Sequence, residues 1–531
     1  MLLFLLFPIY FVLGLLVVWY SWSFGVEIEF NLMSVSLSEL YFCLLFDGVS
    51  CVFVYMLLCC GSLVLFYCFH YFGGSIDSAH LFLLVVWFLD VMVSLILSFS
   101  PILTLIFWEY LGLVSFFLIL FYSNSCSLRA SLVTLFISRL GDVALFIMVM
   151  CFSQLFSFSG VVFSLLFLLI VVTKSACFPF VSWLLEAMRA PTPVSSLVHS
   201  STLVAAGVWF IFRYNGLSEM GIDSGVLTFL CLASIFVTSF CALVFLDLKK
   251  IVALSTCNNI SWCLLFFIFG DLFLSLMQLL VHGICKCYLF ISVGDLMSSS
   301  NSDQSSLGVH LSRYKGNSFF SIIQVFLVLC LSGVPFLGVF FSKHAFFSLL
   351  AYSSGSGILF CFLFCLFFSF VYSVRFCLLL VHDVCGMSLG FGSSFLLICP
   401  LVFLGTFFNY LCVYYILEIF VFDVMSSIMF LIVQGLGCFF GIVSYFLFPV
   451  IFGRWSSLLW GMDSIVSKVY SFFLPFSSFC LVSFYRWEDW VFSKISRISS
   501  KNLSEEFDSL FTLNVLVLGL LFFLGVSLLL F

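Results

Sequence analysis

Residues 227–245 read LTFLCLASIFVTSFCALVF, and residues 161–172 read VVFSLLFLLIVV. A helix needs about 20 mostly apolar residues to cross the hydrocarbon core of a bilayer, and the first run has that length. Neither run alternates apolar and polar side chains, as the strands of a membrane barrel do. These stretches predict an all-α fold built from membrane-spanning helices.

The composition of the whole chain supports the same fold class. Of its 531 residues, 64% are hydrophobic and only 8% are charged, and the mean hydropathy is +1.32. A soluble domain carries about 25% charged residues, so there are too few charges here to coat soluble domains. The net charge of −6 and the lack of a large basic patch exclude nucleic acid as a partner and leave lipid as the surroundings.

The cysteines and the amino terminus carry no targeting or metal pattern. The 23 cysteines are scattered through apolar runs and are interpreted as small apolar residues, with no metal site and no disulfide framework. The first basic residue is Arg129, whereas signal and import peptides need early positive charge. We therefore expect the mature chain to begin at Met1. The 77 phenylalanines are typical of a biased, organellar nucleotide composition.

The apolar runs divide the chain into about 15 or 16 expected membrane spans and into five regions. The regions are N-terminal helices (1–100), a first half (101–247), a second half with following helices (248–450), an amphipathic segment (451–509) and a terminal anchor (510–531). The spans centre near Gly14, Val54, Val86, Leu111, Val143, Leu166, Val204, Ala233, Leu264, Leu280, Leu327, Leu363, Val402 and Val433, and the last covers the anchor. The sparse basic residues leave the orientation open.

The segment 454–508 differs from the rest because its charges are dense and its apolar residues recur between polar ones. Trp487, Trp490, Val491, Ile495 and Ile498 share one helical stripe. Such a stripe suits a helix that lies on a membrane surface or against other helices, and about 50 helical residues would reach about 75 Å. An ordinary loop with a short amphipathic helix is the alternative.

Charged residues inside apolar runs are the strongest functional signal, because each costs at least about 2.5–3.5 kcal/mol at the bilayer centre. Such residues need partners, internal water or a function. They are Glu109, Asp142, Lys174, Lys249, Lys250, Lys286 and Lys343, together with His199 and His282.

Proton exchange is the chemistry that these residue types favour. Burial makes both a carboxylate such as Glu109 and an amine such as Lys174 easier to neutralise, so a buried pair can act as a two-setting switch. The alternatives are a structural ion pair for Glu109 and a lysine that extends from a helix end for Lys174. Lys249 and Lys250 lie where a helix starts. The alternative to a functional role for them is a helix end that is exposed to solvent.

Proline breaks accompany several of these residues. His199 follows Pro191 and Pro193, and Lys343 follows the Gly333–Phe336 break. Broken helices at membrane depth line polar cavities. A satisfied core residue remains the alternative for His199, and a lysine that extends from a helix end remains the alternative for Lys343. His282 and Lys286 share a helical face at i, i+4. A break with a buried lysine occurs twice, which predicts two inverted repeats with a site near mid-membrane.

The residues around these breaks resemble a known family. Residues 174–180 (KSACFPF) lead to 182–184 (SWL), 187–188 (AM), 191–195 (PTPVS) and 199–202 (HSST). Further matching segments are 108–112 (WEYLG), 139–142 (RLGD), 247–251 (DLKKI), 255–256 (ST), His282 with Lys286, 333–343, and 372–373 (YS) with Arg375. The chain resembles the antiporter-like subunits of proton-pumping NADH:quinone oxidoreductase, respiratory complex I. Residues 454–508 and 510–531 resemble the long lateral helix and the terminal anchoring span of the distal antiporter-like subunit.

The resemblance implies roles for nine residues, with both halves antiporter-like. Proton transfer would use Glu109, Lys174, His199, His282, Lys286 and Lys343, with Asp142, Arg139 and Lys250 in support. Glu109 and Lys174 would form a charge pair, Lys286 would be the central carrier, and Asp142 would pair with Arg139 or a neighbouring subunit. The chain departs from the family pattern at Val181, Leu185, Ser298 and His344, where other members often carry His, Pro, His and an acidic residue respectively.

The resemblance also implies a function as a proton-translocating subunit of complex I in the mitochondrial inner membrane, organelle-encoded. The chain itself would bind no cofactor, and flavin, iron–sulfur clusters and quinone would belong to other subunits. Its partners would be other membrane-arm subunits, especially 4 and 2 along the lateral helix. A stand-alone cation/proton antiporter and a structural, non-pumping clamp are the alternative functions.

Overall fold

The computed structural model describes residues 28–35, 40–152, 160–214, 224–269, 272–299, 304–306, 318–353, 356–381 and 424–447, plus positions 14 and 17 and helical positions between 467 and 479. The chain divides into two compact units, Met1–Met462 and Asp463–Phe531. Most of the predicted lateral helix (451–509), the anchor (510–531) and the predicted spans near Gly14 and Val402 lie outside the described residues. The helices and strands that carry labels all belong to the first unit.

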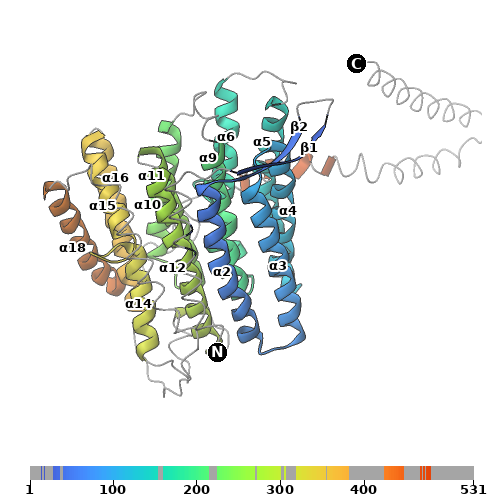
Figure 1. Ribbon diagram of the computed structural model, residues 1–531. Coiled ribbons are helices and arrows are strands. Elements are labelled where there is room, and N and C mark those ends of the chain that lie inside the picture. The colour runs from blue at the N-terminus through green and yellow to red at the C-terminus, as the bar shows by residue number, and fades with distance from the viewer. Residues whose placement is uncertain are drawn as a thin grey trace, which may run out of the picture. The chain divides into compact units, whose positions relative to one another are not determined.

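Helices make up nearly all of the described part of this unit (Figure 1). They are α2 (Gly48–Phe72), α3 (Ile76–Leu97), α4 (Pro101–Ile119), η1 (Leu120–Tyr122), α5 (Ser125–Phe152), α6 (Gly160–Lys174), α7 (Ser182–Ala187), α8 (Thr192–Leu197), η2 (Val198–Thr202), α9 (Leu203–Tyr214), α10 (Ser224–Ala242), α11 (Leu248–Phe269), α12 (Leu272–Ser299), α14 (Ser318–Ser332), α15 (Phe340–Ser353), α16 (Ser356–Val381) and α18 (Val424–Leu447).

The described helices confirm a multi-pass membrane protein. Ten of them are long and apolar enough to cross a membrane, and each contains the centre of one predicted span. The predicted spans near Leu166 and Leu327 coincide with two shorter apolar helices, Val162–Lys174 and Ser321–Ser332. Each of these shorter helices ends where a break begins.

A two-stranded antiparallel hairpin was not predicted. Strand β1 (Ile28–Val35) pairs with β2 (Leu40–Phe46), with Ile28 opposite Phe46 and an irregularity between Asn31 and Met33. Part of β1 alternates apolar and polar residues, as half-buried strands do, but the run is short beside the long apolar helices. The hairpin adds to a fold that is otherwise all-α.

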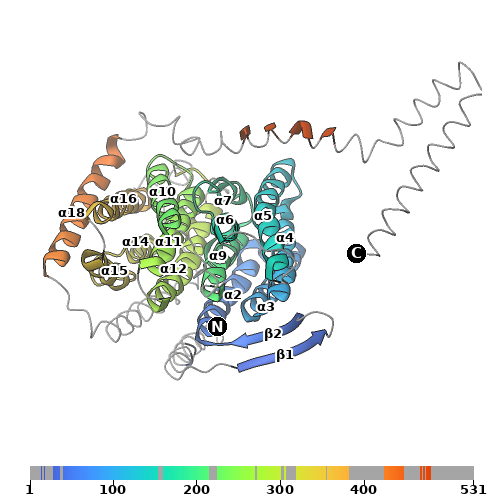
Figure 2. The same ribbon diagram turned by 90° about the horizontal axis from the view of Figure 1, so that it is seen from above.

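The helices stand side by side, with α11 and α12 in the middle of the unit (Figure 2). Helix α12 contacts α2, α8, α11 and α14, while α11 contacts α10 and α12, and α16 contacts α10, α14 and α18. On the other side, α2 packs on α3, α3 on α4, α4 on α5, α5 on α6, and α6 on α9. The central pair therefore joins the helices before residue 247 to those after it.

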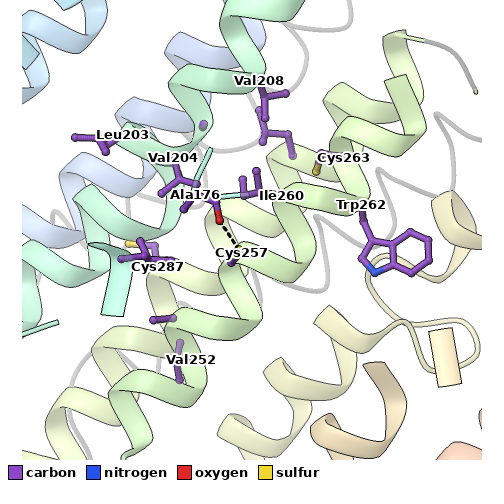
Figure 3. Packing of buried hydrophobic residues seen from close by; sticks show 14 of the residues in the cluster. Ala176, Leu203, Val204, Val208, Val252, Cys257, Ile260, Trp262, Cys263 and Cys287 are labelled. Atoms are coloured by element: carbon purple, nitrogen blue, oxygen red, sulfur yellow. Dashed lines mark hydrogen bonds between the residues drawn. The ribbon is translucent and has the colours of Figure 1, made fainter. Parts of the chain in front are cut away.

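The contact between α11 and the segment after α6 shows how that joint is packed (Figure 3). Cys257 of α11 donates a hydrogen bond from Sγ to the carbonyl oxygen of Ala176 at 2.8 Å. Val204, Val208 and Ile260 are fully buried around it. Ala176 has a positive φ of 55°, a conformation that costs a non-glycine residue about 1–3 kcal/mol. Packing against α11 holds this strained segment in place.

One polar cluster ties together the ends of three helices. Asp47 caps α2 by accepting a hydrogen bond from the Ser50 amide at 2.8 Å, and Arg213 at the end of α9 donates to the same carboxylate at 2.9 Å. Arg213 also donates to the carbonyl oxygen of Ile96 in α3 at 3.1 Å. Its side chain is only 3% exposed, so its charge depends on these partners.

Asp47→Ala should lower the free energy of unfolding by about 2–4 kcal/mol, because it removes a helix cap and leaves the buried Arg213 without its carboxylate. Thermal unfolding in detergent measures the effect. Asp77→Ala is the matched control, since Asp77 lies exposed in the first turn of α3. Equal unfolding temperatures for the two variants would contradict the structural role of the cluster.

Candidate functional site

Four charged residues from three adjacent helices form a continuous chain of ion pairs. Glu109 of α4 pairs with Arg139 of α5, Arg139 lies 3.7 Å from Asp142 one turn further along α5, and Asp142 lies 3.3 Å from Nζ of Lys174 at the end of α6. The expected direct pair of Glu109 with Lys174 is therefore wrong. The expected pair of Asp142 with Arg139 is confirmed, and Asp142 is also the partner of Lys174.

This charge chain runs from a half-exposed surface into the interior. The side chains of Glu109 and Arg139 are 36% and 40% exposed, whereas those of Asp142 and Lys174 are 2% and 1% exposed. Nζ of Lys174 also lies 5.1 Å from the ring centroid of Trp108, within the range of a cation–π contact. Of the four residues, Arg139 is the one that contacts both carboxylates. Its position therefore determines how strongly the Asp142 carboxylate attracts the Lys174 ammonium.

The break around Pro191 and Pro193 places His199 beside this pair. Pro191 precedes the short helix α8, and α8 continues into the π-helical segment η2, which contains His199. His199 is fully buried, and neither of its ring nitrogens has a hydrogen-bond partner among the described residues. Lys174 and His199 line the same cavity of about 10 Å³, which is close to the smallest size that holds one water molecule.

His282 and Lys286 lie one turn apart in the central helix α12. Both are fully buried, and neither ring nitrogen of His282 has a partner among the described residues. Lys286 donates to the hydroxyl of Ser255 and, at 3.3 Å, to the carbonyl oxygen of Val252, both in α11. No carboxylate lies within ion-pair distance of Lys286 in the described part of the chain.

Helix α12 approaches the broken helix very closely near these histidines. A Cβ atom on Gly283 would lie 2.6 Å from Sδ of Met56 and 3.3 Å from Cβ of Ser201. Gly283 follows His282, and Ser201 lies two residues after His199. The glycine therefore allows the two histidine-bearing segments to pack against each other.

Lys343 lies at the second break, between α14 and α15. Its Nζ donates to the carbonyl oxygen of Ser332, the last residue of α14, at 2.7 Å. Nζ also lies 5.9 Å and 6.0 Å from the ring centroids of Trp262 and Phe370. The break has positive φ at Gly333, Phe336 and Gly338. Because α14 ends at this break, the Ser332 carbonyl oxygen can accept a hydrogen bond from the lysine and not from the backbone of a further helical turn.

The supporting residues differ in what they contact. Lys250 pairs with Asp247 at 2.8 Å at the start of α11, and both side chains are about one-third exposed, so Lys250 lies at a solvated helix end. Its neighbour Lys249 is buried and donates to the carbonyl oxygen of Ala190 at 3.3 Å. Lys249, rather than the predicted Lys250, therefore reaches the break that precedes His199.

The four departures from the family pattern are of two kinds. Val181 and Leu185 are buried apolar residues beside the first break, and His344 packs between the rings of Phe340 and Phe430, at 5.6 Å from each centroid. Ser298 is exposed and donates to the carbonyl oxygen of Asp295 at 2.9 Å. These positions therefore contribute packing and a helix-end contact.

Two functional contacts were missed by reasoning from the sequence. Ser255 holds Lys286, and Gln278 accepts a hydrogen bond from Ser342, next to Lys343, at 2.5 Å. Gln278 lies four residues before His282, so three polar side chains occupy one face of α12 at i, i+4 and i+8. That spacing could have indicated Gln278.

The chain is similar in sequence to membrane subunits of one known family. The profile of the family described as "NADH:quinone oxidoreductase/Mrp antiporter, TM" matches residues 98–372, more than half of the chain. NADH-ubiquinone oxidoreductase chain 5 of Aedes aegypti is 36% identical over 335 residues, which cover 60% of this chain and 57% of that protein. The Ascaris suum protein of the same name is 38% identical over 54% of this chain and 53% of its own length.

The Caenorhabditis elegans chain 5 is 34% identical over 65% of this chain and 68% of its own length. With several of these relatives, the similarity spans little more than half of the relative's length. Among solved structures, the Mrp complex from Dietzia sp. DQ12-45-1b matches 98% of this chain and 60% of its own chain, with a TM-score of 0.70 and 20% identity.

An archaeal membrane-bound sulfane sulfur reductase matches 83% of this chain and 93% of its own, with a TM-score of 0.62 and 15% identity. At these identities the two structures show a shared fold and nothing more. The family profile and the relatives go further: the chain belongs to the NADH:quinone oxidoreductase/Mrp antiporter family of membrane-spanning subunits, in its chain 5 branch.

Proposed function

We propose that this chain is a membrane-arm subunit of an NADH:ubiquinone oxidoreductase and translocates protons across the membrane, driven by electron transfer in other subunits. The observation that carries the proposal is the set of buried basic residues, Lys174, Lys286 and Lys343 with His199 and His282, held at two helix breaks and in the central helix. Charged groups at such depth are costly and mark proton pathways in membrane proteins.

The first step uses the chain of ion pairs. In the structure Arg139 is bound to Glu109 and lies 3.7 Å from Asp142, and Asp142 holds the Lys174 ammonium at 3.3 Å. When Arg139 shifts to Asp142, Lys174 loses most of that attraction. An ion pair at about 4 Å with an effective dielectric constant of about 20 is worth about 4 kcal/mol. This shift would therefore favour release of the proton from Lys174 into the cavity that it shares with His199.

The proton would then pass along the middle of the unit. His199 and His282 each have two ring nitrogens without partners in the described structure, so each imidazole can accept a proton on one nitrogen and release one from the other. Lys286 is the next acceptor, held by Ser255 without a carboxylate to fix its charge. Lys343, at the second break, is the last basic group of the line.

The energies are of matching size. Moving one elementary charge across a potential of about 150–200 mV costs about 3.5–4.6 kcal/mol. Making or breaking one ion pair changes the energy by about 4 kcal/mol, and electron transfer in the other subunits would supply this energy. A single switch of Arg139 between Glu109 and Asp142 therefore has about the energy that moving one proton requires.

The same proposal covers the partners, cofactors and location. Electron carriers, including flavin, iron–sulfur clusters and quinone, would belong to other subunits, and this chain would bind none of them. Its neighbours would be the other antiporter-like membrane subunits, 4 and 2, along the lateral segment 451–509. The membrane would be the inner membrane of mitochondria, and the gene would be organellar. The division into regions at residues 100, 247, 450 and 509 belongs to the same proposal.

Asp142→Asn should destabilise the chain by about 3–5 kcal/mol, because it leaves the buried Lys174 ammonium without its carboxylate. The double variant Asp142→Asn with Lys174→Met should recover most of that loss. Thermal unfolding of the four proteins in the cycle measures the coupling energy. A second cycle between Glu109→Gln and Lys174→Met is the control. A larger coupling in this second cycle than in the first would contradict the observed pairing.

Lys286→Met should lower the number of protons translocated per NADH oxidised while the complex still assembles, because methionine has similar length but cannot carry a proton. Proton-to-electron stoichiometry in sealed membranes is the measurement. Arg129→Met is the control, because Arg129 is an exposed basic residue near the start of α5. A normal stoichiometry in the Lys286 variant would rule out its role as carrier.

A further inference from the structure

A histidine–aspartate pair lies apart from the buried lysines, at the ends of α2 and α12. Nε2 of His70 is 3.6 Å from Oδ1 of Asp295, and the two side chains are 49% and 14% exposed. His70 lies in the last turn of α2. The pair therefore connects the surface of the bundle with its central helix.

The buried side chain of Tyr67 lies next to this pair. The ring centroid of Tyr67, one turn before His70 in α2, is 6.0 Å from that of the imidazole. Tyr67 is 0% exposed, and its hydroxyl lies close to Gly294, the residue before Asp295 in α12, as does the hydroxyl of Thr192. The second tyrosine of this turn, Tyr71, packs 5.8 Å from Tyr67.

Gly294 makes room for this contact. A Cβ atom at this position would lie 2.5 Å from Oη of Tyr67 and 3.2 Å from Oγ1 of Thr192. Any larger residue would displace one of the two hydroxyls. The glycine therefore allows the phenol from α2 to meet the threonine of α8 across the surface of α12.

Thr192 is the first residue of the broken helix that contains His199. Helix α8 packs against both α2 and α12, and its residues from Thr192 to Leu197 are all buried. At about 1.5 Å per residue, Thr192 and His199 are about 10 Å apart along the axis. Three buried hydroxyls lie in this interval or next to it, and each donates to a backbone carbonyl oxygen: Ser195 to Thr192 at 2.9 Å, Ser196 to Pro193 at 2.7 Å, and Ser200 to Ser196.

We propose that His70 and Asp295 form a proton-loading site at this membrane face and that Tyr67 and Thr192 connect it to His199. The inference rests on the proposed function and adds to it a route by which protons reach the buried line. An imidazole with a carboxylate partner is the group best suited to collect protons near neutral pH.

The transfer needs no other reactant. The imidazole of His70 binds a proton from the aqueous phase, and Asp295 stabilises the resulting charge. The proton then moves through Asp295 to the hydroxyl of Tyr67, which releases its own proton toward Thr192. Thr192 in turn gives up its hydroxyl proton, and a ring nitrogen of His199 is the final acceptor, reached by rotation of the intervening serine hydroxyls. Each hydroxyl gains one proton and loses one, so the net change is one proton moved inward. The titratable groups that face His70 are Asp295 on α12 and the two tyrosines of its own helix.

A second exposed histidine on the same membrane face provides a matched control. His80 of α3 lies just beyond the turn that joins α2 to α3. It lines a separate cavity of about 450 Å³, whose wall is formed by Asp77 and by aromatic and aliphatic side chains, Phe72, Leu84, Phe121 and Tyr122. His80 offers the same chemistry as His70 without the contact to Tyr67.

The test is NADH-driven proton translocation by the assembled complex in sealed vesicles, measured at about pH 6 and at about pH 8. His70→Gln should slow translocation by about tenfold at the higher pH and much less at the lower one, because a positioned proton-transfer group matters most when protons are scarce. His80→Gln should change neither rate. Equal rates for the two variants at both pH values would overturn the proposal.

Tyr67→Phe is the second variant, and it decides the matter if His70→Gln fails to assemble. It removes the hydroxyl but keeps the ring packing, so translocation should slow at both pH values. Unchanged translocation in Tyr67→Phe would overturn the proposed route. If Lys286→Met lowers the protons moved per NADH while the His70 and Tyr67 variants do not, the loading site fails and the proposed function stands. If Lys286→Met also has no effect, both fail.

Discussion

The cost of a charge in an apolar interior is the constraint on which this structure depends. A chain with 8% charged residues nevertheless buries Asp142, Lys174, Lys286 and Lys343, and each would cost several kcal/mol if it lay alone in hydrocarbon. Asp142 and Lys174 offset this cost by pairing with each other. The other two lysines have no carboxylate within reach in the described structure and rely on oxygen atoms of the backbone and of serine.

Helix breaks supply part of these oxygen atoms. A regular helix uses its carbonyls internally, and only its last turn leaves them free. Lys343 binds the carbonyl of Ser332 where α14 ends, and Lys249 binds the carbonyl of Ala190 just before the break at Pro191. The same breaks hold His199 and Lys343, two of the buried groups to which we assign proton transfer. The proline and glycine positions thus serve both the stability of the buried charges and their proposed chemistry.

The sequence predicted the helices better than the partners. Long apolar runs are sufficient to locate spans, because crossing a bilayer requires a fixed length of apolar helix, and the buried charges were visible as interruptions of these runs. Their pairing was not visible, because it depends on how each helix is rotated. Glu109 pairs with Arg139 and not with Lys174. The i, i+3 spacing of Arg139 and Asp142 was the one local sign of the true arrangement. Likewise, only one of the adjacent Lys249 and Lys250 faces the interior, and composition cannot decide which. His70 and Asp295 lie near helix ends, where charges are common, so only the folded structure shows that they form a pair.

In the proposed function, electron transfer within a larger assembly drives the protonation changes of the buried charges. This proposal is tested most directly by native separation of mildly solubilised membranes, with an in-gel stain for NADH oxidation and identification of this chain in the stained band. We expect the chain to migrate in a very large assembly that oxidises NADH. A chain that migrates alone, or in a small complex without this activity, would contradict the account and favour a free cation/proton antiporter.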